Sequence, residues 1–293
     1  MNTTPITLKT KFALGLALTL WASAFVGIRY GLVSYSPGPL ALFRFIIASF
    51  CLLILCIRLP KNRQKINGKD LCWLLVIGAI TLSIYHVCLN YGELTVSSGI
   101  ASFIISQSPV ITTLLAILFL GERINVYGIL GLLISVFGVT LIMLGQSGAL
   151  KFETGCLFVL ASTVSGSVFS VLQKHFLKKY HSIEVTAYVV LGGAIGMLFY
   201  LPRLIHEMPL ASTKATIATV YLGIFPAGIA YLAWSYALSK LSASRTMNFI
   251  YVMPLMTTIM GWIFLGEVPA LMALIGGLVA LVGVWVVSCS DRI

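Results

Sequence analysis

The chain has 293 residues, of which 59% are hydrophobic and only 9% are charged, and its mean hydropathy is +1.03. Soluble domains carry about 25% charged residues, so this composition excludes an ordinary water-soluble domain. The net charge is +11, but the basic residues lie in short segments between apolar runs, which argues against a nucleic-acid-binding surface. We therefore expect an integral membrane protein that has the lipid bilayer, and no nucleic acid, as its partner.

Apolar runs of roughly 20 residues recur along the chain, and each can cross about 30 Å of hydrocarbon as a helix. Backbone polar groups in lipid must be satisfied within their own segment, so we predict an all-α protein of ten transmembrane helices. Continuous apolar runs also differ from the alternating strands of an outer-membrane barrel. The predicted spans are residues 11–33, 39–59, 70–92, 95–120, 124–145, 153–176, 182–202, 214–239, 243–265 and 269–288.

The second half of the chain repeats the first at a constant offset of 145 residues. A Phe-Leu-Gly-Glu segment ends at Glu122 in one copy and at Glu267 in the other, and a proline precedes each, Pro109 and Pro254. Five spans per half force the second half to insert upside down. The sequence thus predicts two inverted five-helix repeats with a substrate site between them. The predicted halves are residues 1–148 and 149–293.

Most lysines and arginines fall in alternate loops on one side of the predicted membrane. The positive-inside rule makes that side cytoplasmic, so we expect both termini in the cytoplasm. The residues concerned are Lys9, Lys11, Arg58, Lys61, Arg63, Lys65, Lys69, Arg123, Lys174, Lys178, Lys179, Lys240, Arg245 and Arg292.

The first apolar run also has features of a secretory signal peptide, because Lys9 and Lys11 precede it and Ala22-Ser23-Ala24 resembles a cleavage site. Its apolar character continues to Leu32, and cleavage would remove the counterpart of the sixth span. We therefore expect a retained first span.

The paired Phe-Leu-Gly-Glu segments and the arginine that follows a short proline-rich loop (Pro37-Gly38-Pro39, then Arg44-Phe45) resemble the drug/metabolite transporter superfamily, and within it the EamA family. The resemblance covers the whole chain. It implies a secondary transporter of the bacterial inner membrane, in many cases an exporter of amino acids or related metabolites. It leaves the substrate open, and drugs, nucleosides and polyamines stay as alternatives.

Polar and aromatic residues near the middle of the predicted spans are the candidates for substrate binding, because burying them in lipid is costly. Aromatic walls suit flat or apolar groups and hold cations through cation–π contacts. The absence of acidic residues near the midplane favours a neutral, zwitterionic or weakly charged solute over a polycation. The candidates are Trp21, Tyr85, His86, Asn90, Ser106, Gln107, Ser165, Trp234, Asn248 and Tyr251.

Three ionisable residues are candidates for proton coupling or gating. His86 lies well inside a span and titrates near physiological pH, so it is the first choice for proton coupling and Glu93 is the second. The alternative for His86 is a neutral imidazole bonded to a neighbouring helix. Arg44, Arg29 and Glu93 lie toward the outer ends of their helices, where we expect Arg44 to form a structural or gating ion pair.

The repeated prolines and glutamates are assigned structural roles. Pro109 and Pro254 each remove a backbone hydrogen bond inside a predicted helix, and paired helix breaks in two halves point to a carrier's central site. Glu122 and Glu267 each precede a predicted helix, whose N-terminal charge favours a carboxylate by about 0.3–1 kcal/mol. We therefore expect both glutamates to form turns.

Three classes of function remain for such a chain. A carrier working by alternating access explains the repeat and the broken helices. The sequence has no phosphate-binding loop, so we do not expect ATP hydrolysis to drive the transport. An integral-membrane enzyme would need a catalytic or metal motif, and we find none, so no cofactor, metal or catalytic residue is expected. A non-transporting scaffold is the third class. Small residues in the fifth and tenth spans allow close packing within a monomer or across a homodimer.

Overall fold

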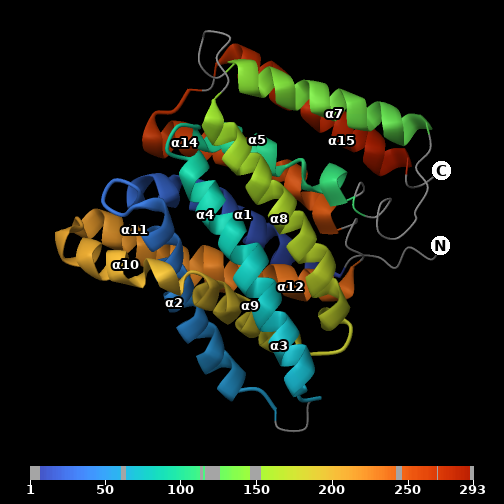
Figure 1. The fold of residues 1–293 in the computed structure, drawn as a ribbon. Helices are drawn as coiled ribbons and strands as arrows, with labels where there is room; N and C mark the ends of the chain where they lie inside the picture. The colour runs from blue at the N-terminus through green and yellow to red at the C-terminus, as the bar shows by residue number, and fades with distance from the viewer. Residues whose placement is uncertain are drawn as a thin grey trace.

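The computed structural model of the protein describes residues 7–60, 64–112, 115, 126–145, 153–241, 246–268 and 270–290. All regular elements within these ranges are helical (Figure 1). In the first half they are α1 (Leu8–Gly31), α2 (Pro37–Ile57), α3 (Gly68–Ile77), η1 (Gly78–Leu82), α4 (Ser83–Gly92), α5 (Ser98–Ile105) and α7 (Val126–Gly145). In the second half they are α8 (Thr154–Leu177), α9 (Ser182–Gly196), η2 (Leu198–Tyr200), α10 (Leu201–Glu207), η3 (Met208–Leu210), α11 (Thr213–Ile224), η4 (Phe225–Ala230), α12 (Tyr231–Lys240), η5 (Asn248–Val252), α14 (Met253–Leu265) and α15 (Leu271–Ser290).

Five of the described helices are long and apolar enough to cross a membrane, so the prediction of a multi-pass helical protein is confirmed. A sixth span is formed if the two parts of a helix bent by 47° near Gly196 are counted together. The five are Leu8–Gly31, Pro37–Ile57, Gly68–Gly92, Thr154–Leu177 and Thr213–Lys240, and the bent pair is Ser182–Gly196 with Leu198–Leu210. The other four predicted spans lie partly outside the described residues, and shorter apolar helices cover the rest.

Several helices begin at polar side chains that satisfy free backbone N–H groups. Thr7 and Asn67 accept hydrogen bonds from the amides of Thr10 and Asp70, in the first turns of α1 and α3. Carboxylates from distant parts of the chain bind the first turns of α2 and α5, and these long-range contacts are described with the candidate site.

Two of the membrane-spanning helices contain a π-helical turn near their middle. The segment η1 interrupts the helix over residues 68–92, and η4 interrupts the helix over residues 213–240. Such turns widen a helix locally and are frequent at functional sites. At Gly78, a Cβ atom would lie 1.9 Å from the carbonyl oxygen of Val189, so only glycine lets η1 pack this closely against α9.

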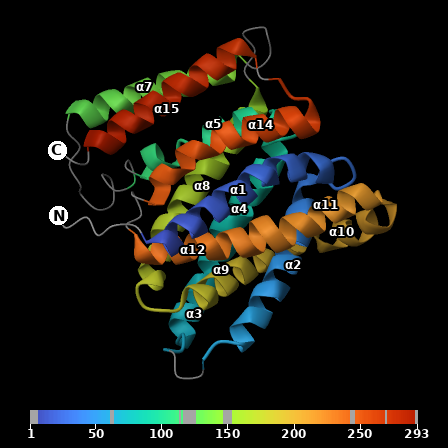
Figure 2. The same ribbon diagram turned by 180° about the vertical axis from the view of Figure 1, so that it is seen from behind.

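The helices α7 and α15 lie side by side along one edge of the molecule, as both views show (Figures 1 and 2). Their contact is close, because Ser135 Oγ donates to the carbonyl oxygen of Ala280 at 3.1 Å. A Cβ atom on Gly138 would lie 2.3 Å from the Ala280 nitrogen. The small residues predicted to allow close packing therefore pair two helices of the same chain. Both helices also contact α5, which connects them to the rest of the bundle.

Candidate functional site

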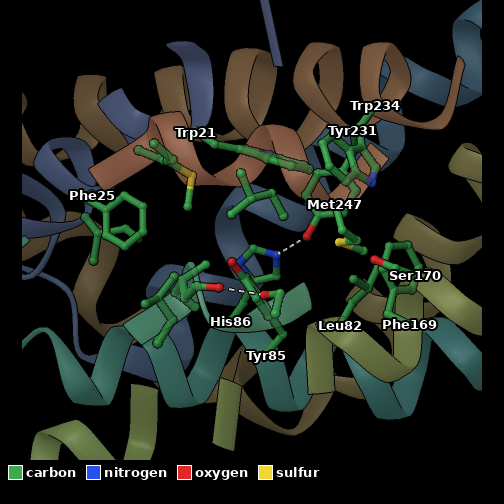
Figure 3. A pocket seen from close by; sticks show the side chains of 18 of the residues that line it. Trp21, Phe25, Leu82, Tyr85, His86, Phe169, Ser170, Tyr231, Trp234 and Met247 are labelled. Carbon is green, nitrogen blue, oxygen red and sulfur yellow. Dashed lines mark hydrogen bonds between the residues drawn. The ribbon is translucent and has the colours of Figure 1, made fainter. Parts of the chain in front are cut away.

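A cavity lies at the centre of the bundle and is lined by both halves of the chain (Figure 3). It offers about 60 Å³ to the centres of water-sized molecules, room for a few waters by the usual measure. The lining residues are Trp21, Ala24, Phe25, Ile28, Arg44, Leu82, Tyr85, His86, Leu89, Ile105, Ser108, Gly166, Phe169, Ser170, Tyr231, Trp234, Met247, Ile250 and Met253. Four of the predicted site residues line it, namely Trp21, Tyr85, His86 and Trp234, together with Arg44.

Aromatic rings from α1, α8 and α12 form one wall of the cavity. The ring centroid of Trp21 lies 5.0 Å from that of Trp234 and 5.5 Å from that of Tyr231. Phe169 of α8 lies 6.0 Å from Tyr231. Trp21 also donates from Nε1 to the carbonyl oxygen of Pro226 at 3.2 Å, which fixes α1 against the π-helical turn η4. These contacts hold the rings in place before any solute arrives.

His86 and Tyr231 join the two halves across the cavity (Figure 3). His86 Nε2 lies 2.9 Å from Tyr231 Oη, and Phe45 and Tyr85 pack their rings against the imidazole. The histidine is buried, and its Nδ1 has no hydrogen-bond partner among the described residues. This is the arrangement of an imidazole bonded to a neighbouring helix, and it leaves one ring nitrogen for a proton or a ligand.

Arg44 is the one lining residue with a permanent charge, and only 2% of its surface is exposed. Its Nε and Nη1 atoms have no hydrogen-bond partner among the described residues. The ion pairs of the described ranges are Arg29–Glu267, Lys179–Asp70 and Arg203–Glu207. The ion pair expected for Arg44 is not one of them. Glu93 is close enough to interact with Arg44 electrostatically, but it forms no ion pair with it in the described residues. Buried N–H donors without a hydrogen-bond partner are costly, so they favour an anionic group in the cavity.

The remaining residues of the predicted charged cluster meet at one end of α1. Arg29 Nε lies 3.1 Å from Glu267 Oε1, and Arg29 Nη1 donates to the carbonyl oxygen of Glu93. Glu267 Oε2 accepts from Ser98 N at 2.8 Å and from Ser98 Oγ at 2.6 Å, at the start of α5. Glu267 therefore does more than the local turn expected from the sequence. Gly266 makes that turn, with a φ of 67°.

Glu93 is fully buried at the end of α4, and neither of its carboxylate oxygens has a hydrogen-bond partner among the described residues. The carboxylate of Glu207, elsewhere in the molecule, has hydrogen-bond partners, as most carboxylates in proteins do. It accepts from the amide and the hydroxyl of Ser36 at 2.9 and 2.6 Å, and it pairs with Arg203.

The other polar candidates do not line the cavity in this conformation, and most of them bond to backbone carbonyls. Asn90 donates to the Pro37 carbonyl oxygen at 2.8 Å, and Ser165 donates to that of Thr81 at 2.7 Å. Ser106 and Gln107 both donate to the Phe103 carbonyl oxygen, at 2.6 and 3.4 Å, and Tyr251 is half-buried. The side chain of Asn248 and the whole of Glu122 lie outside the described residues.

The two predicted helix breaks lie beside departures from α-helical geometry. The helix α5 ends at Ile105, a turn follows at Ser106 and Gln107, and Pro109 lies in the helical turn after it. Pro254 is in the first turn of α14, which follows the 3₁₀-helical η5. Ile105, Ile250 and Met253 line the cavity close to these breaks.

Several lining residues have no sequence signal of their own. Phe25, Phe169 and Met247 line the cavity, but they resemble the other apolar residues of the spans. Phe169 lies one helical turn after the candidate Ser165 on α8, so a search along that helix face would have found it.

Basic residues at the opposite end of the bundle are held by backbone and side-chain partners. Lys174 Nζ donates to the carbonyl oxygens of Leu238 and Leu241, the second at 2.6 Å. Lys179 lies 2.6 Å from Asp70, and this bond raises the pKa of the Lys179 ammonium. Within the described ranges no three His, Cys, Asp or Glu side chains gather as metal ligands would.

The chain is similar, along nearly its whole length, to a family of transporters and to proteins named as transporters. The sequence profile of the EamA-like transporter family matches residues 9–144 and again residues 153–289. The chain is 39% identical over 269 residues to "Uncharacterized transporter YdfC" of Bacillus subtilis (strain 168), covering 92% of this chain and 87% of the relative. It is 35% identical over 280 residues to the "Probable terminal-alkyne amino-acid exporter" of Streptantibioticus cattleyicolor, covering 96% and 93%.

A solved structure described as "Crystal structure of protein" shares the fold, with a TM-score of 0.68 and 19% identity over 97% of this chain and 98% of that one. The family profile matches nearly the whole chain in two parts, and both relatives match it over nearly the same length. The chain belongs to the EamA-like transporter family, as the sequence resemblance had predicted.

Proposed function

We propose that the protein is a secondary transporter that exports an amino acid or a closely related metabolite across the bacterial cytoplasmic membrane. The central cavity is the substrate site, and it opens alternately to the two sides. Both chain termini lie in the cytoplasm in this proposal, as the distribution of basic loops predicts. The observation that carries it is a buried Arg44 with unpartnered donors in a cavity otherwise walled by aromatic and apolar side chains.

The cavity has complementary places for the two charges of an amino acid. Arg44 offers N–H donors to a carboxylate, the group that guanidinium recognises best. Trp21, Trp234 and Tyr231 offer ring faces, which attract an ammonium by about 0.5–2 kcal/mol. The relative from Streptantibioticus cattleyicolor, which is named a probable amino-acid exporter, supports the same class of substrate.

The runner-up substrates fit this cavity less well. A polyamine would need acidic partners, and no acidic residue lines the cavity. A bulky drug or nucleoside would need more space than the present conformation offers. A small zwitterion needs no acidic lining residue and a smaller widening of the cavity than a drug or a nucleoside.

We propose that residues 1–148 and 149–293 form two inverted repeats that move against each other during transport. The offset of 145 residues recurs in contacts of the structure, between His86 and Tyr231 and between Ser135 and Ala280. A residue that touches its own counterpart lies close to a two-fold axis. Another pair of hydrogen bonds supports the proposal, since Arg29 donates to the Glu93 carbonyl as Lys174 donates to that of Leu238.

An ion gradient is the proposed energy source, with protons as the coupling ion. His86 is the first candidate for the proton site, because Nδ1 is available inside the cavity wall. Glu93 is the second, because its carboxylate is buried without a hydrogen-bond partner among the described residues. The functional unit is the monomer, since α7 and α15 pack against each other within one chain.

Counterflow into proteoliposomes tests the substrate class. Vesicles loaded with an unlabelled amino acid should accumulate the labelled one, and the Arg44→Gln variant should do so only at higher amino-acid concentrations. The charge-assisted bond is worth about 1.5–3 kcal/mol, so we expect about a tenfold or greater rise in KM. Arg58→Gln is the matched control, because Arg58 is exposed at the end of α2.

Analogues separate the proposed role of Arg44 from a structural one. A primary amine without a carboxylate should inhibit amino-acid uptake only weakly, and it should do so equally in the wild-type protein and in Arg44→Gln. Full amino-acid transport by Arg44→Gln would contradict the carboxylate site. A wild-type protein that moves no member of an amino-acid panel would favour the drug and nucleoside alternatives, and no transport of any solute would favour a scaffold.

A further inference from the structure

A second site lies on the outside of the bundle, at the end of the molecule that holds Lys174 and Lys179. A polar pocket of about 520 Å³ lies between the end of α8, the link to α9 and the end of α12. An apolar groove of about 370 Å³ continues from it along α1, α9 and α12. The two spaces share His181, Ser182 and Tyr236, so they form one continuous depression with a polar part and an apolar part.

The polar part is basic. Lys178 and Lys240 line it, and neither forms an ion pair within the described part of the chain. The neighbouring Lys179 is different, because Asp70 binds it. Glu184, the acidic residue in the first turn of α9, is buried and lines neither space. The N-terminus of α9 begins at Ser182 in the same pocket, and its partial positive charge adds to that of the lysines.

The apolar part has the shape and chemistry that a hydrocarbon chain requires. Phe12 and Leu16 of α1 form one side, and Ile229 and Leu232 form the other. Phe12 is 71% exposed although it is a large apolar residue, which is expected for a surface that faces lipid. The groove starts at the basic pocket and follows α1 and α12, both of which are membrane-spanning.

The counterpart of this site in the other half lacks the positive charges. At the offset of 145 residues, Lys178 corresponds to Val33 and Lys240 corresponds to Thr95. The aromatic residues are kept, because Tyr180 corresponds to Tyr35 and Tyr236 to Tyr91. The basic residues are thus a property of one end only, the end that the positive-inside rule places in the cytoplasm.

We propose that this depression binds an anionic phospholipid of the cytoplasmic leaflet, with its phosphate between Lys178 and Lys240 and an acyl chain in the groove between α1 and α12. Basic pockets between membrane helices on the cytoplasmic side suit such headgroups. The bound lipid joins the ends of α8, α9 and α12, two of which carry cavity residues, and so stabilises the bundle. The site is independent of the identity of the transported solute.

The test is lipid titration of the purified full-length protein in a mild neutral detergent, followed by thermal unfolding and native mass spectrometry. Phosphatidylglycerol should raise the unfolding temperature and stay bound, whereas phosphatidylcholine should do neither at the same concentration. The double variant Lys178→Gln, Lys240→Gln should weaken phosphatidylglycerol binding by about fivefold for each lysine removed. Lys65→Gln with Lys69→Gln is the matched control, since both lysines are exposed at the predicted cytoplasmic side and neither lines the depression.

Three results would overturn the proposal. Equal stabilisation by both lipids would show that the pocket does not select charge. Unchanged phosphatidylglycerol binding by the Lys178 and Lys240 double variant would place the lipid elsewhere. An equal shift with soluble glycerol phosphate would show a small-anion site without an acyl chain. If the double variant is less stable without lipid, the number of lipids retained in the mass spectrum still decides the question.

Discussion

His86 Nε2 and Tyr231 Oη lie 2.9 Å apart, and the two residues are separated by 145 positions, the offset at which the sequence repeats. Each is therefore the counterpart of the other, and they meet at the cavity. The pair holds α4 of one half against α12 of the other half. A movement of the halves against each other during transport would have to lengthen or break this bond.

The Tyr231→Phe variant is expected to be less stable by about 1–3 kcal/mol, because the buried His86 Nε2 loses its partner while the ring packing is kept. The double variant His86→Phe, Tyr231→Phe should recover part of the loss, since it leaves neither polar group unpaired. Unfolding of the double variant and of the single variants His86→Phe and Tyr231→Phe in detergent measures the coupling between the residues. A loss in the double variant equal to the sum of the two single losses would show that the bond contributes nothing.

We expect His86 to be the residue that makes the transport rate vary with pH. The groups that face its ring are Arg44 of α2, Tyr85 of its own helix and Tyr231 of α12. Arg44 keeps its charge throughout the physiological range, and the two phenols do not titrate there. The imidazole is thus the group in the cavity wall that we propose exchanges the coupled proton during the transport cycle.

His86→Gln is expected to flatten the dependence of uptake rate on pH in proteoliposomes, because glutamine can bond to Tyr231 but cannot take up a proton. His175→Gln is the control, since His175 is exposed near the end of α8. A pH profile that His86→Gln leaves unchanged would transfer the coupling role to Glu93, and Glu93→Gln would then be the variant to measure.

The membrane-spanning helices and the family could be predicted from the sequence, because apolar length and a repeated motif are local properties of the chain. The cavity was predicted in part. Trp21, His86 and Trp234 line it. They were predicted to do so because polar or bulky aromatic side chains near the middle of a span indicate a functional role. Asn90 and Ser165 were candidates for the same reason, but both donate to carbonyls of neighbouring helices. Sequence alone does not separate a polar group that binds a solute from one that binds a backbone.

The role of Glu267 was not accessible from its local sequence. Its position before a helix predicts a turn, whereas its carboxylate binds Ser98, which is 169 residues away. Arg44 illustrates the same limit. Its cost in a membrane predicts an ion pair, whereas Arg44 forms none of the ion pairs of the described residues and lines the cavity instead. Long-range partners of this kind follow from tertiary packing.

Glu267 is expected to keep one end of the cavity closed, because it joins α1 through Arg29 and α5 through Ser98. The ion pair is partly exposed, and most of the stabilisation therefore comes from the two hydrogen bonds to Ser98. Glu267→Gln should weaken the closed state by about 1–2 kcal/mol, or about tenfold in population. The measurement is labelling of Ala24→Cys, a cavity position, by a membrane-impermeant thiol reagent in a variant without native cysteines.

Glu207→Gln is the control for this prediction. Glu207 makes the same contacts with Ser36 and Arg203 at the start of α2, away from the cavity lining. It should lower the unfolding temperature without changing the labelling rate at Ala24→Cys. Similar labelling rates in both variants and in the wild-type background would show that the Glu267 network stabilises the fold and does not close the cavity.

The packing of α7 on α15 should contribute to stability and not to substrate binding. Gly138→Leu places a side chain where even a Cβ atom would lie 2.3 Å from the Ala280 nitrogen, so the two helices must separate. Overpacking of this kind costs about 1–3 kcal/mol, and it should also break the bond from Ser135 to Ala280.

Gly15→Leu is the matched control, because a Cβ atom there has nothing within 4 Å. Gly138→Leu should keep the wild-type KM in proteoliposomes, since neither α7 nor α15 lines the cavity, and Gly15→Leu should keep it because Gly15 itself is not a lining residue. Only Gly138→Leu should unfold at a lower temperature. A raised KM in Gly138→Leu would mean that α7 and α15 influence the substrate site through α5, the element they share, and would assign this pair a part in transport.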